Sequence, residues 1–527
     1  MTTQAPPEVA ETRPRRRFVA RGLSGIIAAG VVLGVGELAA VPIDPNSSPF
    51  FAVGNVTVDR APEFAREFAI ETFGTNDKPA LFIGMSIAMV LIGALIGLIE
   101  RPRRPLGSVA LIVLGLVAVY ASQQRITSDW TFAIPSIVGV VFGILVLRLL
   151  IGALAQVAPK DPDSKPVSES RLPRRKFLVL GTGIAAAAVA IGVAGRYIGA
   201  RLTDVVADRA NFRLPSVRDK AKPIAAGTDI NVPGSTTFLT PNETFYRIDT
   251  ALQVPKLVRD DWQLRIHGMV DREITLNWDD LVARTAMERT ITLTCVSNEV
   301  GGPLAGNATW IGYAIKDLLD EAGVDPEADM LLSTSVDGWT SGTPVAALRD
   351  GRDAILAVSM NGEPLPLEHG YPVRQVVPGL YGFVSATKWV VDWELTRFDK
   401  AEAYWTKRGW GAQAPIKTAS RIDVPAALAP VPAGRVVVAG TAWAQRRGIE
   451  KVEIRVDKQE WQPAVLAPEY SIDTWRQWTY EWDAAAGNHV IEVRATDLDG
   501  NTQTEERTPP IPGGSTGWHN RTIIVRA

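Results

Sequence analysis

The sequence predicts a fold of three parts: a bundle of transmembrane helices, then an α+β domain, then a β-sandwich. Long apolar stretches are confined to about the first 200 of the 527 residues. Helix and strand periodicities are mixed in the middle of the chain, and only short β-like runs separated by turn residues follow. The expected domains are residues 1–204, 205–418 and 419–527.

Five apolar stretches near the N-terminus have the composition of membrane-spanning helices. They are rich in Leu, Ile, Val, Ala and Gly, and most approach the ~20 residues that a helix needs to cross a hydrocarbon core. They cover residues 22–40, 80–99, 106–121, 130–147 and 177–197. We therefore expect about five transmembrane helices, of which the third is the shortest.

The charges between these stretches predict the orientation of the membrane domain. Segments 42–79 and 122–129 are balanced or acidic. Basic residues gather before the first stretch, between the second and the third, and before the fifth: Arg13, Arg15, Arg16, Arg17, Arg21, Arg101, Arg103, Arg104, Lys160, Lys165, Arg171, Arg174, Arg175 and Lys176. Because basic loops stay in the cytoplasm, we expect a multi-pass plasma-membrane protein with a cytoplasmic N-terminus. Everything after about residue 200 is then extracytoplasmic.

Two arginines, Arg174 and Arg175, directly precede the fifth stretch. Twin arginines before a moderately apolar, Gly- and Ala-rich stretch resemble a twin-arginine export signal, a route for folded proteins. An ordinary basic flank of a membrane helix explains the same residues. Both interpretations stay open.

Composition excludes several classes of function. The chain carries 55 basic and 57 acidic residues, a balance that argues against a nucleic-acid-binding protein. Its single cysteine excludes an intrachain disulfide, a Cys-rich zinc site and an iron–sulfur cluster held by this chain alone. None of the four histidines falls in an apolar stretch, so we expect no membrane haem held by two histidines.

The middle of the chain predicts an α+β domain. Residues 262–270 alternate like a strand, and residues 291–295 are expected to form a short strand. Residues 277–285 and 313–322 have helical spacing, and Gly323 ends the second of these helices. The segment contains neither a Gly-x-Gly-x-x-Gly motif nor a P-loop, so a nucleotide cofactor is not indicated.

The last hundred residues predict a β-sandwich. Five β-rich runs cover residues 435–444, 449–456, 475–482, 489–496 and 521–525. Turn residues such as Gly, Asn and Asp separate them. Short strands at this spacing are typical of an immunoglobulin-like sandwich, here without a disulfide.

The lone cysteine, Cys295, follows the sequence TLT at the end of a probable strand and precedes VSNE. A free cysteine is often a buried core residue, which is the structural interpretation. Two observations favour a functional one. A strand that gives way to a Ser- and Asn-containing loop exposes side chains, and the absence of every other cysteine avoids stray oxidation outside the cytoplasm.

A second cluster lies in residues 360–379, a loop-like run dense in Gly and Pro that holds its backbone in fixed shapes. His369 and Arg374 lie in it, and Lys388 follows soon after. Three potential cations in rigid loops suit an anionic ligand, with arginine offering a bidentate contact to phosphate. A structural histidine and ordinary surface charges are the alternative.

Three motifs carry a resemblance to a known family. The TLTC strand, the run MNGEPLPLEHGYPVR and the following VPGLYGFVSATKW closely resemble the sulfite oxidase family of molybdopterin-dependent oxidoreductases. The resemblance covers about residues 235–415. The multi-span N-terminal part is similar to membrane-anchored bacterial members. The β-rich C-terminal part resembles the family's immunoglobulin-like domain, often a dimerisation module, which is compatible with a homodimer.

The resemblance implies molybdopterin as the cofactor and one cysteine thiolate as the protein's molybdenum ligand, with the pterin dithiolene supplying the other sulfurs. Cys295 is then the metal ligand. His369 and Arg374 match positions that bind the pterin and its phosphate. The other cofactor-binding positions that the resemblance implies are Phe245, Tyr246, Arg247, Asp249, Asp337, Ala386, Thr387 and Lys388.

Two departures bear on the substrate. Arg247 keeps an arginine that sulfite oxidases use near the anionic substrate, but Ile248 and Asp249 replace the asparagine and histidine that follow it there. The active-site tyrosine of the family falls at Trp410, which has no ionisable hydroxyl. Asp249 would also add negative charge where sulfite must bind. The resemblance therefore supports the cofactor more strongly than sulfite itself.

The expected function is that of a membrane-anchored molybdenum oxidoreductase performing oxo transfer on the extracytoplasmic side. Cys295, Arg247 and Trp410 are the expected catalytic residues, and Lys407 and Arg408 could help orient an anionic or oxo-bearing substrate by charge. A separate cytochrome or quinone would exchange the electrons, and we expect no haem in this chain and no nucleic-acid partner. One alternative is an enzyme with the same cofactor that reduces a sulfoxide or another S- or N-oxide. An alternative of another class is a non-catalytic, membrane-anchored binding module.

Overall fold

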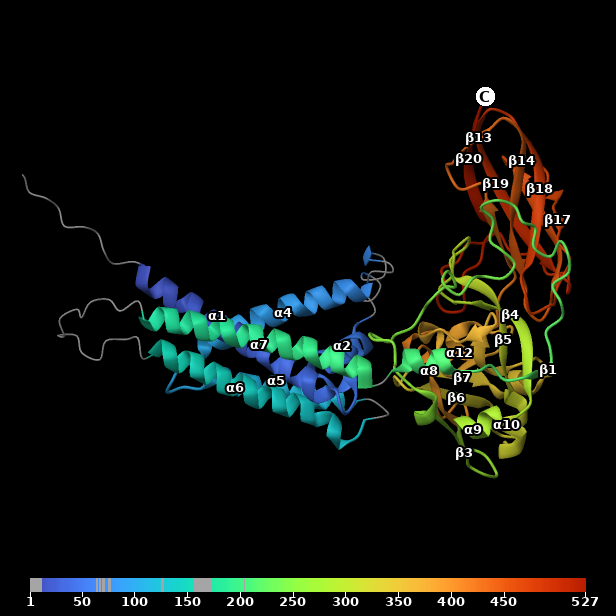
Figure 1. Cartoon of the computed structure of the whole chain (residues 1–527). Coiled ribbons are helices and arrows are strands. Elements are labelled where there is room, and N and C mark those ends of the chain that lie inside the picture. The colour runs from blue at the N-terminus through green and yellow to red at the C-terminus, as the bar shows by residue number, and fades with distance from the viewer. Residues whose placement is uncertain are drawn as a thin grey trace, which may run out of the picture. The chain divides into compact units, whose positions relative to one another are not determined.

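The structure is a computed structural model that describes residues 12–62, 65, 68, 72–73, 77–124, 128–155, 172–202 and 204–527. The chain divides into two compact units. The first is residues 1–204 with 251–253, and the second is residues 205–250 with 254–527. Each unit is described by itself (Figure 1).

The first unit is helical. Its described helices are α1 (Thr12–Ala40), α2 (Pro49–Arg60), α4 (Asp77–Ile99), α5 (Leu106–Ser122), α6 (Ile134–Ala155) and α7 (Leu172–Leu202). Helix α1 packs against α4, α6 and α7. A Cβ on Gly25 would lie 2.0 Å from the carbonyl oxygen of Gly93, so only glycine lets α1 and α4 approach this closely, as small residues do in membrane bundles.

Among the described residues of this unit, three stretches are long and apolar enough to cross a membrane: Phe18–Ala40, Lys78–Ile99 and Trp130–Leu154. The other two stretches predicted to span are helical but shorter in their described apolar part, at Leu106–Ser122 and Val179–Gly195. Of the basic residues on which the orientation depends, Lys160, Lys165 and Arg171 lie outside the described residues. The twin arginines fall in the first turn of α7.

The second unit begins with an α+β region built on two sheets that share one hydrophobic core. The first sheet contains β1 (Val217–Asp219), β4 (Ala286–Thr294), β5 (Ala305–Ala314), β8 (Ile355–Met360) and β10 (Arg374–Val376) in this order, with β9 (Glu363–Pro364) beside β8. The second has the order β3 (Ile274–Asn277), β2 (Gln263–Gly268), β11 (Val390–Thr396), β6 (Met330–Ser335) and β7 (Thr340–Pro344).

Short helices connect these strands. They are α8 (Val205–Asn211), α9 (Trp278–Val282), α10 (Ile315–Ala322), α11 (Val345–Arg349) and α12 (Gly382–Ser385). Asn277 caps α9 through a side-chain bond from the Asp280 N–H, and Gly323 ends α10 in the left-handed region at φ 67°. The four predicted elements of this region are therefore present, although β4 begins at Ala286 and its partner β5 was not predicted.

The rest of the second unit is all β. One sheet has the order β12 (Ala419–Val424), β14 (Gly434–Trp443), β18 (Arg476–Ala484) and β17 (Val465–Leu466). The other has the order β13 (Pro430–Pro432), β20 (His519–Arg526), β19 (Gly487–Asp497), β15 (Ile449–Val456) and β16 (Gln462–Pro463). All five predicted β-rich runs are strands. Alternate residues of both sheets, such as Trp478 and Val493, meet in one core, and we call this region the β-domain.

Candidate active site

One cavity of about 130 Å³ lies in the α+β region of the second unit. Its walls come from the segment 245–250, the end of β4, the turn after β6, the loop around His369 and the segment 382–389, together with Trp405 and Trp410. The sequence-predicted residues that line it are Phe245, Tyr246, Asp249, Cys295, Asp337, His369, Arg374, Ala386, Lys388 and Trp410. Segments far apart in the sequence therefore converge on one site.

Cys295 stands directly after β4 and is 9% exposed. Its N–H donates to the Leu304 carbonyl at 2.9 Å, and its own carbonyl accepts from the Asn298 N–H at 3.1 Å, so a tight turn presents the side chain. Burial raises the pKa of the thiol, while hydrogen bonding from Ser297 and the charge of Lys388 act in the opposite sense. Burial therefore keeps an isolated thiol protonated at neutral pH, and a bound metal ion would favour its thiolate form.

No group of three or more His, Cys, Asp or Glu side chains converges on a possible metal position among the described residues. A metal at Cys295 would therefore need most of its ligands from a bound cofactor.

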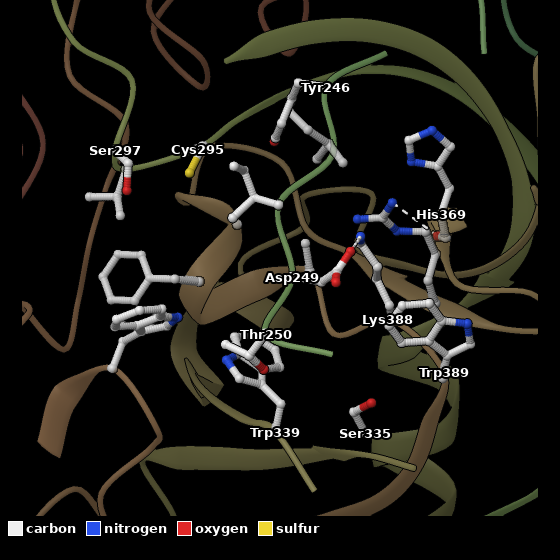
Figure 2. Close-up of a pocket in the computed structure, with 18 of the residues that line it drawn as sticks. Tyr246, Asp249, Thr250, Cys295, Ser297, Ser335, Trp339, His369, Lys388 and Trp389 are labelled. Carbon is white, nitrogen blue, oxygen red and sulfur yellow. Dashed lines mark hydrogen bonds and ion pairs between the residues drawn. The ribbon is translucent and has the colours of Figure 1, made fainter. Parts of the chain in front are cut away.

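A cationic pole lies across the cavity from Cys295 (Figure 2). Arg374, on β10, is 4% exposed, and its Nη1 donates to the His369 carbonyl at 3.2 Å. The guanidinium lies over the Trp310 ring at 5.1 Å. Its Nε is buried without a hydrogen-bond partner among the described residues. Lys388 Nζ donates to the Glu368 carbonyl at 2.9 Å.

Burial sets the charges of this pole. It lowers the pKa of Arg374 to about 10 and that of Lys388 to about 8, so both side chains stay protonated at neutral pH. It lowers the pKa of His369 to about 3, helped by the charges of Arg374 and Lys388. His369 is therefore neutral at pH 7, and it serves as a hydrogen-bonding group rather than as a third cation.

The segment 245–249 crosses the middle of the cavity. The Phe245 ring stacks on Tyr246 at 5.2 Å and meets His369 edge-on at 5.6 Å. Burial raises the pKa of Tyr246, which therefore stays protonated. Arg247 is not among the described residues that line the cavity. Its Nε donates instead to Asp249 Oδ2 at 2.8 Å, and its side chain is 40% exposed.

Thr387 also lies behind the cavity wall rather than in it. The residue is fully buried, its Oγ1 shares a hydrogen bond of 2.8 Å with Ser341 Oγ, and its carbonyl accepts from the Gln375 N–H. These contacts tie the segment 386–388 to β7 and β10. Asp337 lines the cavity, and its Oδ1 accepts from the Trp339 N–H at 3.1 Å.

An aromatic wall forms the remaining side of the cavity, and we define it as Trp339, Phe383, Trp405 and Trp410. Trp410 lies 5.7 Å from the Phe383 ring and 6.0 Å from the Trp405 ring. Of these four residues the sequence singled out Trp410 alone. The only sequence signal for Trp405 was that it stands beside Tyr404, just before the Lys-Arg-Gly turn.

Lys407 and Arg408 are not among the described lining residues. Arg408 lies over the Tyr404 ring at 3.5 Å and donates to the Tyr404 carbonyl at 2.6 Å. The structure thus places Arg408 against the neighbouring chain segment and not in the cavity.

Comparison with known proteins assigns this region. Residues 251–405 match the model of the "oxidoreductase molybdopterin binding domain". The chain is 28% identical to human mitochondrial sulfite oxidase over 348 residues, which are 55% of this chain and 60% of the relative. It is 32% identical to the uncharacterised oxidoreductase YuiH of Bacillus subtilis over 149 residues, which are 28% of this chain and 72% of the relative.

The chain is also similar to a solved structure, the sulfane dehydrogenase SoxCD from Paracoccus pantotrophus. The match has 21% sequence identity and a TM-score of 0.48, and it covers 61% of this chain and 94% of the other. The chain spans about 60% of the length of the human sulfite oxidase that it matches.

The cavity fits the cofactor that this family model names. A buried guanidinium whose Nε has no hydrogen-bond partner among the described residues calls for an acceptor, and the phosphate of a molybdopterin is one. At the opposite pole, a single thiol suits a metal whose other soft ligands come from a dithiolene. Together with the sequence matches, this shows that the chain belongs to the sulfite oxidase family of molybdopterin-binding oxidoreductases.

Proposed function

We propose that the protein is a membrane-anchored molybdenum enzyme that performs oxo transfer on the extracytoplasmic side. The observation that carries the proposal is one cavity with the buried thiol of Cys295 at one pole and the buried cations Arg374 and Lys388 at the other. Molybdopterin, when bound, supplies a metal that exchanges an oxygen atom and two electrons with the substrate.

The chain's residues then have separate tasks. Cys295 serves as the metal ligand, and the metal's charge offsets the burial that otherwise keeps the thiol protonated. Arg374 and Lys388 bind the anionic part of the cofactor, and neutral His369 offers it a hydrogen bond. Thr387, bonded to Ser341, holds the segment 386–388 in place. The cofactor-binding positions that complete the proposal are Phe245, Tyr246, Arg247, Asp249, Asp337 and Ala386.

The substrate would meet the aromatic wall on the Cys295 side. Trp410 shapes that wall but cannot exchange a proton through an ionisable hydroxyl. Tyr246 remains protonated through burial, so it can donate a hydrogen bond to an oxygen of the substrate. Arg247, half-exposed and paired with Asp249, would act on an approaching substrate from outside the cavity.

The helical unit would serve as the anchor. Three helices that are long and apolar enough to span a membrane support it, and the basic flanks favour a cytoplasmic N-terminus. A catalytic domain on the outer side would exchange electrons with a cytochrome, or with quinone at the membrane. We propose domain boundaries at residues 204 and 418, and an immunoglobulin-like class for the β-domain with a homodimer through it.

The alternative activity is reduction of a sulfoxide or another S- or N-oxide on the same cofactor. The aromatic wall favours it, because such a wall binds an apolar substituent better than it binds sulfite. A non-catalytic binding module remains the alternative of another class, and it predicts a purified chain without metal.

The test is to purify the full chain from a host that makes molybdopterin and to measure its molybdenum by elemental analysis. We expect about one molybdenum per chain. Cys295→Ser should lose the metal while keeping the melting temperature of the cofactor-free protein, and the surface variant Asp399→Asn should retain it. A wild-type chain without molybdenum, or a Cys295→Ser chain that keeps both metal and turnover, contradicts the proposal. Sulfite with an artificial acceptor and a sulfoxide with an artificial donor distinguish the two directions.

A further inference from the structure

Asp249 forms a bridge between the two cations on its side of the cavity. Its Oδ2 lies 2.8 Å from Arg247 Nε and 3.1 Å from Lys388 Nζ. The carboxylate is 7% exposed and the Lys388 side chain 11%. Figure 2 shows Asp249 in the middle of the pocket, with the ion pair to Lys388 drawn as a dashed line. A shielded pair of this kind is screened weakly by salt.

This bridge lowers the positive charge that an anionic substrate would need. Of the described lining residues, Asp249 and Asp337 are carboxylates and Arg374 and Lys388 are cations, so their formal charges cancel. Arg247 is drawn towards Asp249 and lies outside the lining. An anionic group of the cofactor that binds Arg374 offsets the positive charge of this residue. The net formal charge of the remaining lining residues is then negative. A doubly charged anion would then find no net electrostatic attraction in the cavity.

The surface near Cys295 is apolar instead of cationic. Leu293 and Val296 flank the cysteine in the lining, and the residues of the aromatic wall line the same cavity. Such a surface gains free energy from burying methyl or aryl groups. Divalent sulfur also makes favourable contacts with aromatic rings, which favours sulfur compounds over N-oxides.

We propose that Asp249 is a specificity-determining residue: by pairing with both Arg247 and Lys388 it lowers the positive charge of the cavity, which then takes an uncharged organic sulfoxide in preference to sulfite. The inference rests on the proposed molybdenum chemistry and names its substrate class. In the reaction the S–O bond breaks, two electrons come from two equivalents of a one-electron donor outside the chain, and two protons are taken up from the buffered solution. The products are the thioether and one water molecule.

The test compares wild-type holoprotein, Asp249→Asn and the control Asp399→Asn, whose carboxylate pairs with the exposed Arg397 outside the cavity. Methyl phenyl sulfoxide is reduced with reduced viologen, and sulfite is oxidised with ferricyanide. Rates are normalised to molybdenum content. Sulfate is added as an unreactive anion, with chloride at equal ionic strength as the reference, and its effect on both the rate and the melting temperature is measured.

We expect wild-type kcat/KM for the sulfoxide to exceed that for sulfite at least a hundredfold, and sulfate to inhibit no more than chloride. In Asp249→Asn the sulfate inhibition constant should fall at least tenfold, and sulfate should raise the melting temperature by several degrees. Asp399→Asn should behave as wild type. The effect on melting temperature requires no turnover, so it reports anion binding even in a slow variant.

Two results overturn the inference. One is a molybdenum-loaded wild type that prefers sulfite, and this measurement stands even where Asp249→Asn does not fold. The other is a folded, molybdenum-loaded Asp249→Asn with the wild-type response to sulfate. A wild type without molybdenum overturns the proposed function as well, so the two failures are distinguishable.

Discussion

Thr292, three residues before Cys295, accepts a hydrogen bond at its Oγ1 from the N–H of Trp475 in the β-domain, at 2.8 Å. The Thr292 N–H donates to the Asp473 carbonyl, and its own carbonyl accepts from Gln445 Nε2 at 3.1 Å. The β-domain thus holds the strand that carries the cysteine. Ser515 does the same beyond it, donating to the Asn298 carbonyl at 2.6 Å.

Thr292→Val should therefore weaken the attachment of β4 to the β-domain. Thr292 is fully buried and also donates to Asn307 Oδ1 at 3.0 Å. The valine leaves a buried N–H and a buried amide oxygen without these partners, at a cost of roughly 2 kcal/mol or more in the free energy of unfolding. Denaturant unfolding followed by tryptophan fluorescence measures it. Thr275→Val, at an exposed position of β3, is the control and should change little.

Removing the buried cation should separate cofactor binding from stability. Arg374→Met takes away a buried guanidinium whose pKa is lowered by burial and whose Nε has no hydrogen-bond partner in the part of the chain that the structure describes. An apolar side chain of similar volume avoids that desolvation. We expect the cofactor-free variant to melt at or above the temperature of cofactor-free wild type, while molybdenum content falls at least tenfold.

The matched control for this change is Arg397→Met, at an exposed arginine paired with Asp399 and Glu327. It should leave the molybdenum content unaltered. A normal molybdenum content in Arg374→Met would show that the cofactor does not need this cation.

The sequence predicted the poles of the site better than its walls. The residues at the poles lie in short motifs whose unusual composition can be recognised without knowing the fold. They are Cys295, His369, Arg374 and Lys388. Trp339 and Phe383 reach the cavity only because β6, β7 and α12 bring distant segments together, and a lone aromatic residue in a sequence is typical of any core.

The sequence also did not predict the balance of charges in the cavity. The segment ending in Asp249 predicted an arginine directed at the substrate, but the two-residue spacing lets Arg247 pair with Asp249 instead. Likewise, strand β5 was not predicted, because its small and polar residues AGNAT become buried only through pairing with β4 and β8.

Acid should destabilise the protein through His519 of the β-domain. This residue is 8% exposed, and its Nδ1 accepts from the Ile422 N–H at 2.9 Å. Burial lowers the pKa of His519 to about 4, with nearby arginines contributing. The unfolded chain binds a proton on the His519 ring near pH 6.5, and the folded chain does not. Above pH 6.5 this proton therefore takes nothing from the free energy of unfolding. That free energy falls as the pH drops from there to about 4, by roughly 3 kcal/mol in total.

Melting temperatures between pH 7.5 and 4 measure this loss, and His519→Asn, which keeps an acceptor, should reduce it. His489 gives a control of opposite sign, because its hydrogen bond to Asp457 raises the pKa of the ring. Its stabilisation is present below pH 6.5 and is lost as the pH rises, so His489→Asn should make the acid loss slightly steeper. An unchanged pH profile in His519→Asn would contradict the assignment.

Shortening the aromatic wall should affect binding of apolar substrates more than any other property. Trp410→Ala removes the ring that contacts both Phe383 and Trp405, and a lost apolar contact of this size costs ~1–3 kcal/mol of binding. We expect the KM for methyl phenyl sulfoxide to rise about tenfold or more, and that for dimethyl sulfoxide to rise less. Trp461→Ala, which removes a ring packed on Trp518 in the β-domain, should leave both KM values unchanged. Equal effects on the two sulfoxides would mean that Trp410 supports the fold of the cavity and does not contact the substrate, because only a direct contact discriminates between an aryl and a methyl group.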